Sequence, residues 1–128
     1  MRLYIGGAFQ GKKDYVMSLF PEAYLAEGEA MDEDSLGDEA FVWNNLHLYI
    51  RERLAAGDSE SDIEEAVLRI ADKSNCVAVI SNEVGSGVVP LQKEERIYRD
   101  VCGRIMTRLA GKAEGVERIV CGIAVKIK

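Results

Sequence analysis

Segments with the hydrophobic pattern of buried β-strands alternate along this chain with segments that have the pattern of amphipathic helices. The continuous apolar run at residues 76–80 is typical of a strand that is covered on both faces of a sheet. Apolar residues four positions apart, from Ile97 to Leu109, predict an amphipathic helix over about residues 93–110. Strands that alternate with helices indicate an α/β fold whose mainly parallel sheet carries helices on both faces.

The same pattern places the remaining elements. Further strands, of which the last pairs back as an edge strand, are expected at residues 2–5, 23–26, 40–43, 116–121 and 123–127. Further helices are expected at residues 14–20, 46–54 and 63–70. Pro21 and Gly57 end the first two, and Ser61 with Glu64 has the spacing of a capping box at the start of the third.

Size and composition favour one domain over residues 1–128. The chain is 48% hydrophobic and 30% charged, and it has no repeat or linker. No apolar run approaches the roughly 20 residues of a membrane span, and the first residues lack the pattern of a secretory signal. The three cysteines, Cys76, Cys102 and Cys121, do not have metal-ligand spacing. We therefore expect a cytoplasmic protein with reduced, mostly buried thiols.

Negative charge is concentrated in one part of the chain, although the net charge is only −6. Residues 14–50 contain nine acidic residues and no Lys or Arg, and most of these acids lie in residues 22–39, the acidic segment. We interpret this segment as a solvated loop, and a surface for a protein partner is the alternative. Without a basic excess or a recognition motif, no nucleic-acid partner is expected.

A glycine-bearing loop follows the first predicted strand and precedes the first predicted helix. Residues 6–12 fit the phosphate-binding pattern G-x-x-x-x-G-K, in which backbone N–H groups face phosphate oxygens and the lysine adds a positive charge. Lys13 stands where this pattern has a metal-binding Ser or Thr, and it brings a second positive charge. A glycine-rich turn with two solvated lysines is the alternative. The predicted nucleotide-binding residues of this glycine loop are Gly6, Gly7, Ala8, Phe9, Gln10, Gly11, Lys12 and Lys13.

A second group of polar residues and glycines follows the strand at residues 76–80. Asn82 and Glu83 lie at its carboxyl end, where parallel sheets bind ligands, and Gly85 and Gly87 permit close approach of a ligand to the backbone. The alternative is a capped turn in which Glu83 is tied to the local backbone. Arg99 lies on the helix that follows.

Together these residues resemble a known family. The motif N-E-V-G-x-G-x-V-P is present at residues 82–90, R-D-x-x-G-R at residues 99–104, and G-I-x-V-K at residues 122–126. They are similar to the bifunctional adenosylcobinamide kinase / adenosylcobinamide-phosphate guanylyltransferase family of cobalamin biosynthesis, and the glycine loop extends the resemblance. The resemblance implies a P-loop, RecA-like three-layer fold. It also implies phosphorylation of cobinamide with ATP or GTP, followed by GMP transfer through a histidine.

The resemblance assigns roles to individual residues and partners. It implies that Lys12 and Glu83 are catalytic. It places substrate-side residues at Asn82, Gly85 and Gly87 in one loop and at Arg99 on the helix that follows. ATP or GTP is the implied nucleotide, a corrinoid the implied second substrate, and a homo-oligomer the implied assembly.

The chain departs from this family where metal binding and GMP transfer take place. Lys13 replaces the metal-binding hydroxyl, and Asn44 stands where the family has a Walker-type Asp. Met106 and Thr107 stand where the family has an Asn-Gln pair. The helix that carries the family's histidine has no counterpart, and His47, the only histidine, follows Asn44 and reads as an ordinary helix residue. We therefore predict no metal-ligating residue and no ordinary Mg²⁺ site.

Three hypotheses follow. The first is a nucleotide-binding relative that has lost guanylyltransferase function and has weak or no kinase activity. The second is a kinase limited to the first half-reaction, with Glu83 as the remaining carboxylate near the phosphates. The third is a non-catalytic interaction or regulatory subunit whose acidic segment contacts a partner.

Overall fold

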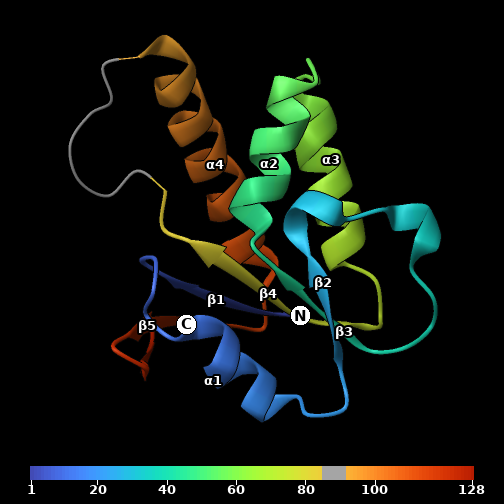
Figure 1. Ribbon diagram of the computed structural model, residues 1–128, viewed down its shortest axis with the longest axis vertical. Helices are drawn as coiled ribbons and strands as arrows, with labels where there is room; N and C mark the ends of the chain where they lie inside the picture. The colour runs from blue at the N-terminus through green and yellow to red at the C-terminus, as the bar shows by residue number, and fades with distance from the viewer. Residues whose placement is uncertain (85–91) are drawn as a thin grey trace.

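Six strands form one sheet in the computed structural model, which describes residues 1–84 and 92–128 of the chain (Figure 1). Their spatial order is β2-β3-β4-β1-β5-β6. All neighbouring strands are parallel except β5 and β6, which form an antiparallel hairpin. The strands are β1 (Arg2–Gly6), β2 (Tyr24–Glu27), β3 (Phe41–Asn44), β4 (Cys76–Asn82), β5 (Gly115–Val120) and β6 (Ile123–Lys126).

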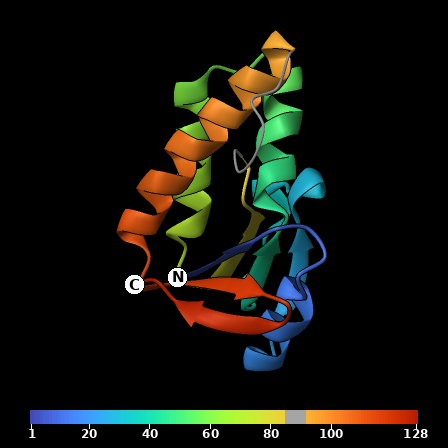
Figure 2. The same cartoon turned by 90° about the vertical axis from the view of Figure 1, so that its left-hand side faces the viewer.

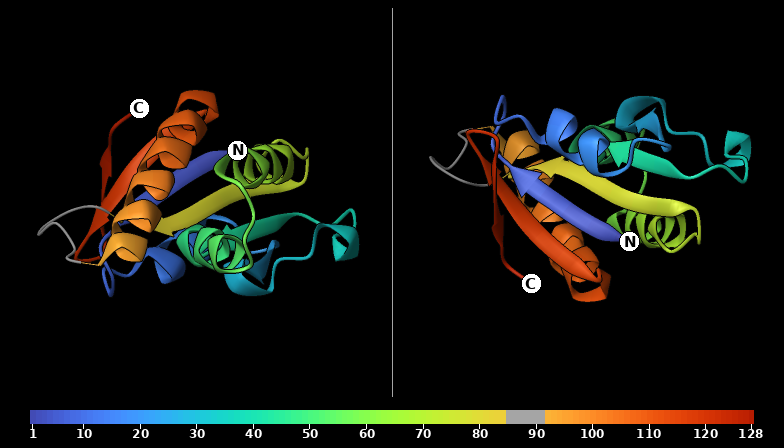
Figure 3. Two further views of the ribbon diagram at one scale, coloured as in Figure 1. Left: turned by 90° about the horizontal axis from the view of Figure 1, so that it is seen from above. Right: turned by 90° about the horizontal axis from the view of Figure 1, so that it is seen from below.

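Helices cover both faces of this sheet, as the alternating pattern predicted. Three of them, α2, α3 and α4, lie on one face, and α1 lies on the other (Figures 2 and 3). Neighbouring residues of β1 show the division, because Leu3 packs in the core under the three helices and Tyr4 packs with Val16 of α1. The helices are α1 (Lys12–Leu19), α2 (Leu46–Ala55), α3 (Glu60–Ala71) and α4 (Lys93–Lys112).

Two predicted helix starts were wrong. Helix α1 begins at Lys12 and not at residue 14, because Gly11 (φ 82°) turns the chain directly into the helix. Helix α3 is capped by Ser59, whose side chain accepts a hydrogen bond from the N–H of Asp62 at 3.1 Å. Ser61 therefore lies inside the helix, and the earlier start lets Glu60 form an ion pair with Arg104 of α4 at 2.7 Å.

The edge strand β6 leaves apolar side chains exposed. Ile123, Val125 and Ile127 are each more than half exposed, and Val125 pairs with Arg118 of β5 in the antiparallel register. Cys76 and Cys102 are buried, and burial raises the pKa of each thiol to about 12, whereas Cys121 is exposed. No helix within residues 1–84 and 92–128 combines the length and the apolar character of a membrane span.

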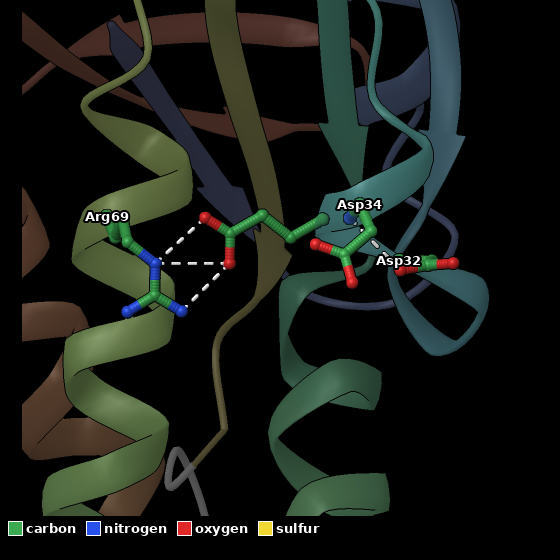
Figure 4. Close-up of polar contacts among 4 residues, drawn as sticks. Asp32, Asp34 and Arg69 are labelled. Carbon is green, nitrogen blue, oxygen red and sulfur yellow. Dashed lines mark hydrogen bonds and ion pairs between the residues drawn. The ribbon is translucent and has the colours of Figure 1, made fainter.

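The acidic segment is held more firmly than the solvated loop that its charge predicted. It contains two 3₁₀ turns, Gly28–Ala30 and Glu33–Ser35. Arg69 of α3 reaches across to Glu33 with both Nε (2.8 Å) and a terminal nitrogen (2.8 Å), as Figure 4 shows. The side chain of Asp32 accepts a hydrogen bond from the N–H of Asp34 at 3.1 Å. This segment therefore supplies the edge strand β2, packs its first 3₁₀ turn against α2, and is joined to α3 by the ion pair of Glu33.

Candidate functional site

The glycine loop leaves the central strand β1 at Gly6 and enters α1 at Lys12. A Cβ at Gly6 would lie 2.5 Å from the carbonyl oxygen of Ile119, so only glycine fits where the loop leaves the sheet. Phe9 (φ 60°) and Gly11 (φ 82°) adopt left-handed backbone conformations, and the Phe9 ring is fully exposed. These turns bring the loop back over the carboxyl end of β1, where parallel sheets bind ligands.

The main-chain N–H groups of this loop are available to a ligand. Within the described residues, no N–H from Gly7 to Lys13 donates to a protein acceptor, and the first helical bond runs from the N–H of Tyr15 to the oxygen of Gly11 at 3.1 Å. The first N–H groups of a helix have no partner inside it and carry the positive end of its dipole. The loop and the start of α1 thus offer a set of donors suited to an anion.

Lys12 adds a buried positive charge beneath these donors. Its side chain is only 8% exposed, and its Nζ donates to the oxygen of Gly7 at 2.6 Å, folding back under the loop. Burial lowers the pKa of Lys12, and the negative charge of Glu83 acts in the opposite direction. An anionic ligand would supply a stronger partner for this ammonium group than a carbonyl does.

The hairpin turn between β5 and β6 holds the loop in place, a contact that the sequence analysis missed. The side-chain oxygen of Gln10 accepts from the N–H of Cys121 at 2.7 Å, and its main-chain oxygen accepts from the N–H of Gly122 at 2.8 Å. Cys121 (φ 51°) and Gly122 (φ 76°) both have the left-handed conformation of a tight hairpin turn. The glycine after a predicted strand signalled this turn, but nothing in the sequence signalled its contact with Gln10.

A cavity of about 550 Å³ lies beside the glycine loop, and we call it the loop cavity. It brings together six of the predicted nucleotide-binding residues, from Ala8 to Lys13, with Asn82 of the predicted substrate side. Residues that the sequence analysis did not assign to the site complete its wall; these are Asp14, Asn44, Asn45, His47, Leu48 and Ile80. Gly85 and Gly87 lie outside the described residues.

Glu83 and Arg99 are not among the residues that line the loop cavity. The carboxylate of Glu83 forms a two-point ion pair with Arg118 of β5, at 2.9 and 3.1 Å, and its N–H donates to the oxygen of Gly6 at 2.9 Å. The Glu83 side chain is thus tied to a side chain of β5, and not to the local backbone as the alternative expected. Arg99, on α4, lines a separate cavity of about 650 Å³ with Val84 and residues of α3.

The residues of the loop cavity do not fit an ordinary Mg²⁺ site. Asn44, 5% exposed at the end of β3, donates its amide N–H groups to both carboxylate oxygens of Glu27 at 3.2 Å. Asn45 donates to the same carboxylate at 3.2 Å. Glu27 is thus engaged by two amides, and Lys13 supplies a cation where Mg²⁺ sites have a hydroxyl. The described residues contain no cluster of three His, Cys, Asp or Glu side chains suited to a metal.

His47 lines the loop cavity, a position that its sequence context did not indicate. It lies in the first turn of α2, directly after β3, and is 7% exposed. Its Nδ1 accepts a hydrogen bond from the N–H of Asn82 at 3.1 Å, and its main-chain oxygen accepts from the hydroxyl of Tyr98 at 3.0 Å. Burial, assisted by the positive charges of Lys12 and Arg51, lowers the pKa of His47 to about 4, so the ring is neutral at pH 7.

This neutral imidazole predicts a loss of stability in mild acid. The unfolded chain protonates His47 near pH 6.5 and the folded chain only near pH 4. The stabilisation is therefore complete above pH 6.5 and is lost as the pH falls, by about 2 kcal/mol at pH 5. Urea denaturation at pH 7 and pH 5 should show this loss in the wild type and not in His47→Asn. Equal losses in both proteins would contradict the prediction, because other acids contribute equally to each.

A family model matches this chain over most of its length, and two known proteins match about half of it or less. Residues 21–127 match the family model described as cobinamide kinase / cobinamide phosphate guanyltransferase. The chain is 43% identical over 68 residues to the bifunctional adenosylcobalamin biosynthesis protein CobU of Salmonella typhimurium, covering 51% of this chain and 38% of that protein. It is 46% identical over 52 residues to the Escherichia coli protein of the same name, covering 41% and 29%. The chain therefore aligns with less than half the length of each relative.

These matches confirm the resemblance that the C-terminal motifs indicated. The mainly parallel sheet with helices on both faces agrees with the P-loop NTPase-like α/β fold that the resemblance implied. The glycine loop precedes residue 21, so its interpretation depends on its geometry and not on the family match. Because the family model matches most of the chain, the protein belongs to the cobinamide kinase / cobinamide phosphate guanyltransferase family.

Proposed function

We propose that this protein binds a nucleoside triphosphate, ATP or GTP, in the loop cavity, with the phosphates over the glycine loop. One observation carries the proposal: within the described residues, the consecutive N–H groups from Gly7 to Lys13 have no protein acceptor, and Ala8 to Lys13, with the buried Lys12 among them, line one cavity. Such an arrangement binds phosphate oxygens through hydrogen bonds and charge together.

The activity we propose is that of a cobinamide kinase-like protein of cobalamin biosynthesis, with guanylyltransferase function lost and kinase activity weak or absent. Phosphoryl transfer depends on metal ions and positioned charges. In this chain the amide of Asn44 donates a hydrogen bond to Glu27, and the carboxylate of Glu83 forms an ion pair with Arg118. Neither side chain is therefore free to ligate a metal ion at the phosphates, which favours binding over catalysis.

Nucleotide binding should be nearly independent of Mg²⁺. Because Lys12 and Lys13 supply the positive charge at the phosphates, we expect the Kd for GTP or ATP to change by less than about threefold when EDTA replaces Mg²⁺. Isothermal titration calorimetry with each nucleotide, with and without Mg²⁺, measures this directly. Absence of binding at millimolar nucleotide would overturn the proposed function, and a strict requirement for Mg²⁺ would overturn the metal-independent site.

A non-catalytic interaction or regulatory subunit on the same fold is the second candidate. The observation that favours it is the exposed apolar row of Ile123 and Val125 on the edge strand β6 and Ile127 directly after it, which also supports a homo-oligomer. Incubation with adenosylcobinamide and GTP tests the second candidate. Phosphorylated corrinoid would exclude a non-catalytic subunit, whereas nucleotide binding without turnover agrees with both candidates.

A further inference from the structure

The hydrogen bonds of His47 fix which ring nitrogen carries the proton. Its Nδ1 accepts from the N–H of Asn82 at 3.1 Å, so that nitrogen presents a lone pair. A neutral imidazole has one donor and one acceptor nitrogen. The proton of this neutral ring is therefore on Nε2, and Nε2 is a hydrogen-bond donor.

The Nε2–H group lacks a partner within the described residues, although the residue is 93% buried. Nε2 is not among the fully enclosed side-chain atoms that are unpaired, so it retains access to space outside the protein. The exposed part of His47 lines the loop cavity, which Lys12 and Asn82 also line. A buried donor without an acceptor is uncommon in native proteins, and a ligand in the cavity would satisfy it.

We propose that His47 binds the nucleotide directly, with its Nε2–H donating a hydrogen bond to a phosphate oxygen. This proposal rests on the proposed function, because the ligand is the nucleotide placed there. A phosphate oxygen is the acceptor that the surroundings favour, since the free N–H groups of the glycine loop and the ammonium of Lys12 gather around the same cavity. His47 then adds a neutral donor to the charged and main-chain donors that line the same cavity.

The same hydrogen bonds argue against His47 as a carrier of GMP. Attack on a phosphorus atom needs a nitrogen with a free lone pair. The lone pair of Nδ1 is occupied by the N–H of Asn82, and Nε2 carries the proton. His47 is thus arranged to bind a phosphate and not to form a bond to it.

Nitrogen NMR tests the assignment in the wild-type protein. His47 is the only histidine, so ¹⁵N-histidine labelling yields one imidazole ring. We expect the proton on Nε2 in the free protein and a shift of the Nε2–H resonance on addition of GTP. A proton on Nδ1, or an Nε2–H resonance that GTP leaves unmoved while calorimetry detects binding, would overturn the proposal.

Two substitutions separate direct binding from a structural role. His47→Asn places an oxygen near the position of Nδ1, where it can accept from the N–H of Asn82, but removes the donor at Nε2. His47→Gln places an amide N–H near the position of Nε2. We expect the asparagine variant to raise the Kd for GTP about tenfold and the glutamine variant to raise it less than about threefold.

The outcomes distinguish this proposal from the function on which it rests. If wild-type protein binds neither GTP nor ATP, the proposed function fails and this proposal fails with it. If the wild type binds GTP and His47→Asn binds equally well, only the role of His47 is overturned. Equal weakening by both substitutions indicates a structural role and likewise overturns the proposal.

Discussion

Replacing Lys12 with alanine is expected to weaken binding of GTP and ATP about a hundredfold. The substitution removes a buried ammonium that lies beneath the glycine loop and is 8% exposed. Hydrogen bonds to charged groups contribute about 1.5–3 kcal/mol each, and about 2.7 kcal/mol corresponds to a hundredfold change in Kd. Isothermal titration calorimetry on the wild type and Lys12→Ala measures the difference.

The folded state should tolerate this substitution. Burial lowers the pKa of Lys12, so the fold disfavours its charged form, and removal of that charge relieves this cost. Lys13→Ala is the matched control, since Lys13 is the neighbouring lysine but is exposed. We expect its effect on the Kd to be only about threefold. Equal binding by wild type and Lys12→Ala would show that the ammonium group of Lys12 does not contact the phosphates.

The elements of this fold could be predicted because each depends on a local pattern. The continuous apolar run of β4 and the apolar stripe of α4 each lie within one short segment, so each pattern predicts its element and the residues that it buries. The geometry of the glycine loop was equally local, since the spacing of Gly6, Gly11 and Lys12 predicts it within seven residues. The start of α3 could not be predicted in this way, because Ser59 and Ser61 each have an acidic residue three positions later. The ion pair of Glu60 with Arg104, which requires the earlier start, joins residues far apart in the sequence.

The walls of the candidate site could not be predicted, because they form between segments far apart in sequence. Gln10 bonds to Cys121 across 111 positions, and His47 bonds to Asn82 across 35. Sequence placed Glu83 beside the phosphates, but the parallel pairing of β1 with β4 and β5 sets Arg118 close enough to bind it. Side-chain partners of this kind depend on strand order and register, which a single sequence does not specify.

The strongest single destabilisation we expect comes from a glycine that sequence analysis passed over. Gly28 is buried where the acidic segment meets the start of α2, and a Cβ there would lie 1.9 Å from the oxygen of Asn45 and 2.8 Å from that of Asn44. Both contacts are with backbone, so the segment must move as a whole. Gly28→Ala should therefore lower the free energy of unfolding by about 3 kcal/mol.

The same movement should reach the loop cavity, because Gly28 follows Glu27, whose carboxylate holds the amides of Asn44 and Asn45. Gly37→Ala is the matched control in the same segment, since a Cβ at Gly37 meets nothing within 4 Å. Its free energy of unfolding should change by less than about 0.5 kcal/mol. Urea denaturation of the wild type, Gly28→Ala and Gly37→Ala measures the change in the free energy of unfolding that each substitution causes. Similar midpoints for Gly28→Ala and Gly37→Ala would mean that the acidic segment does not pack closely against α2.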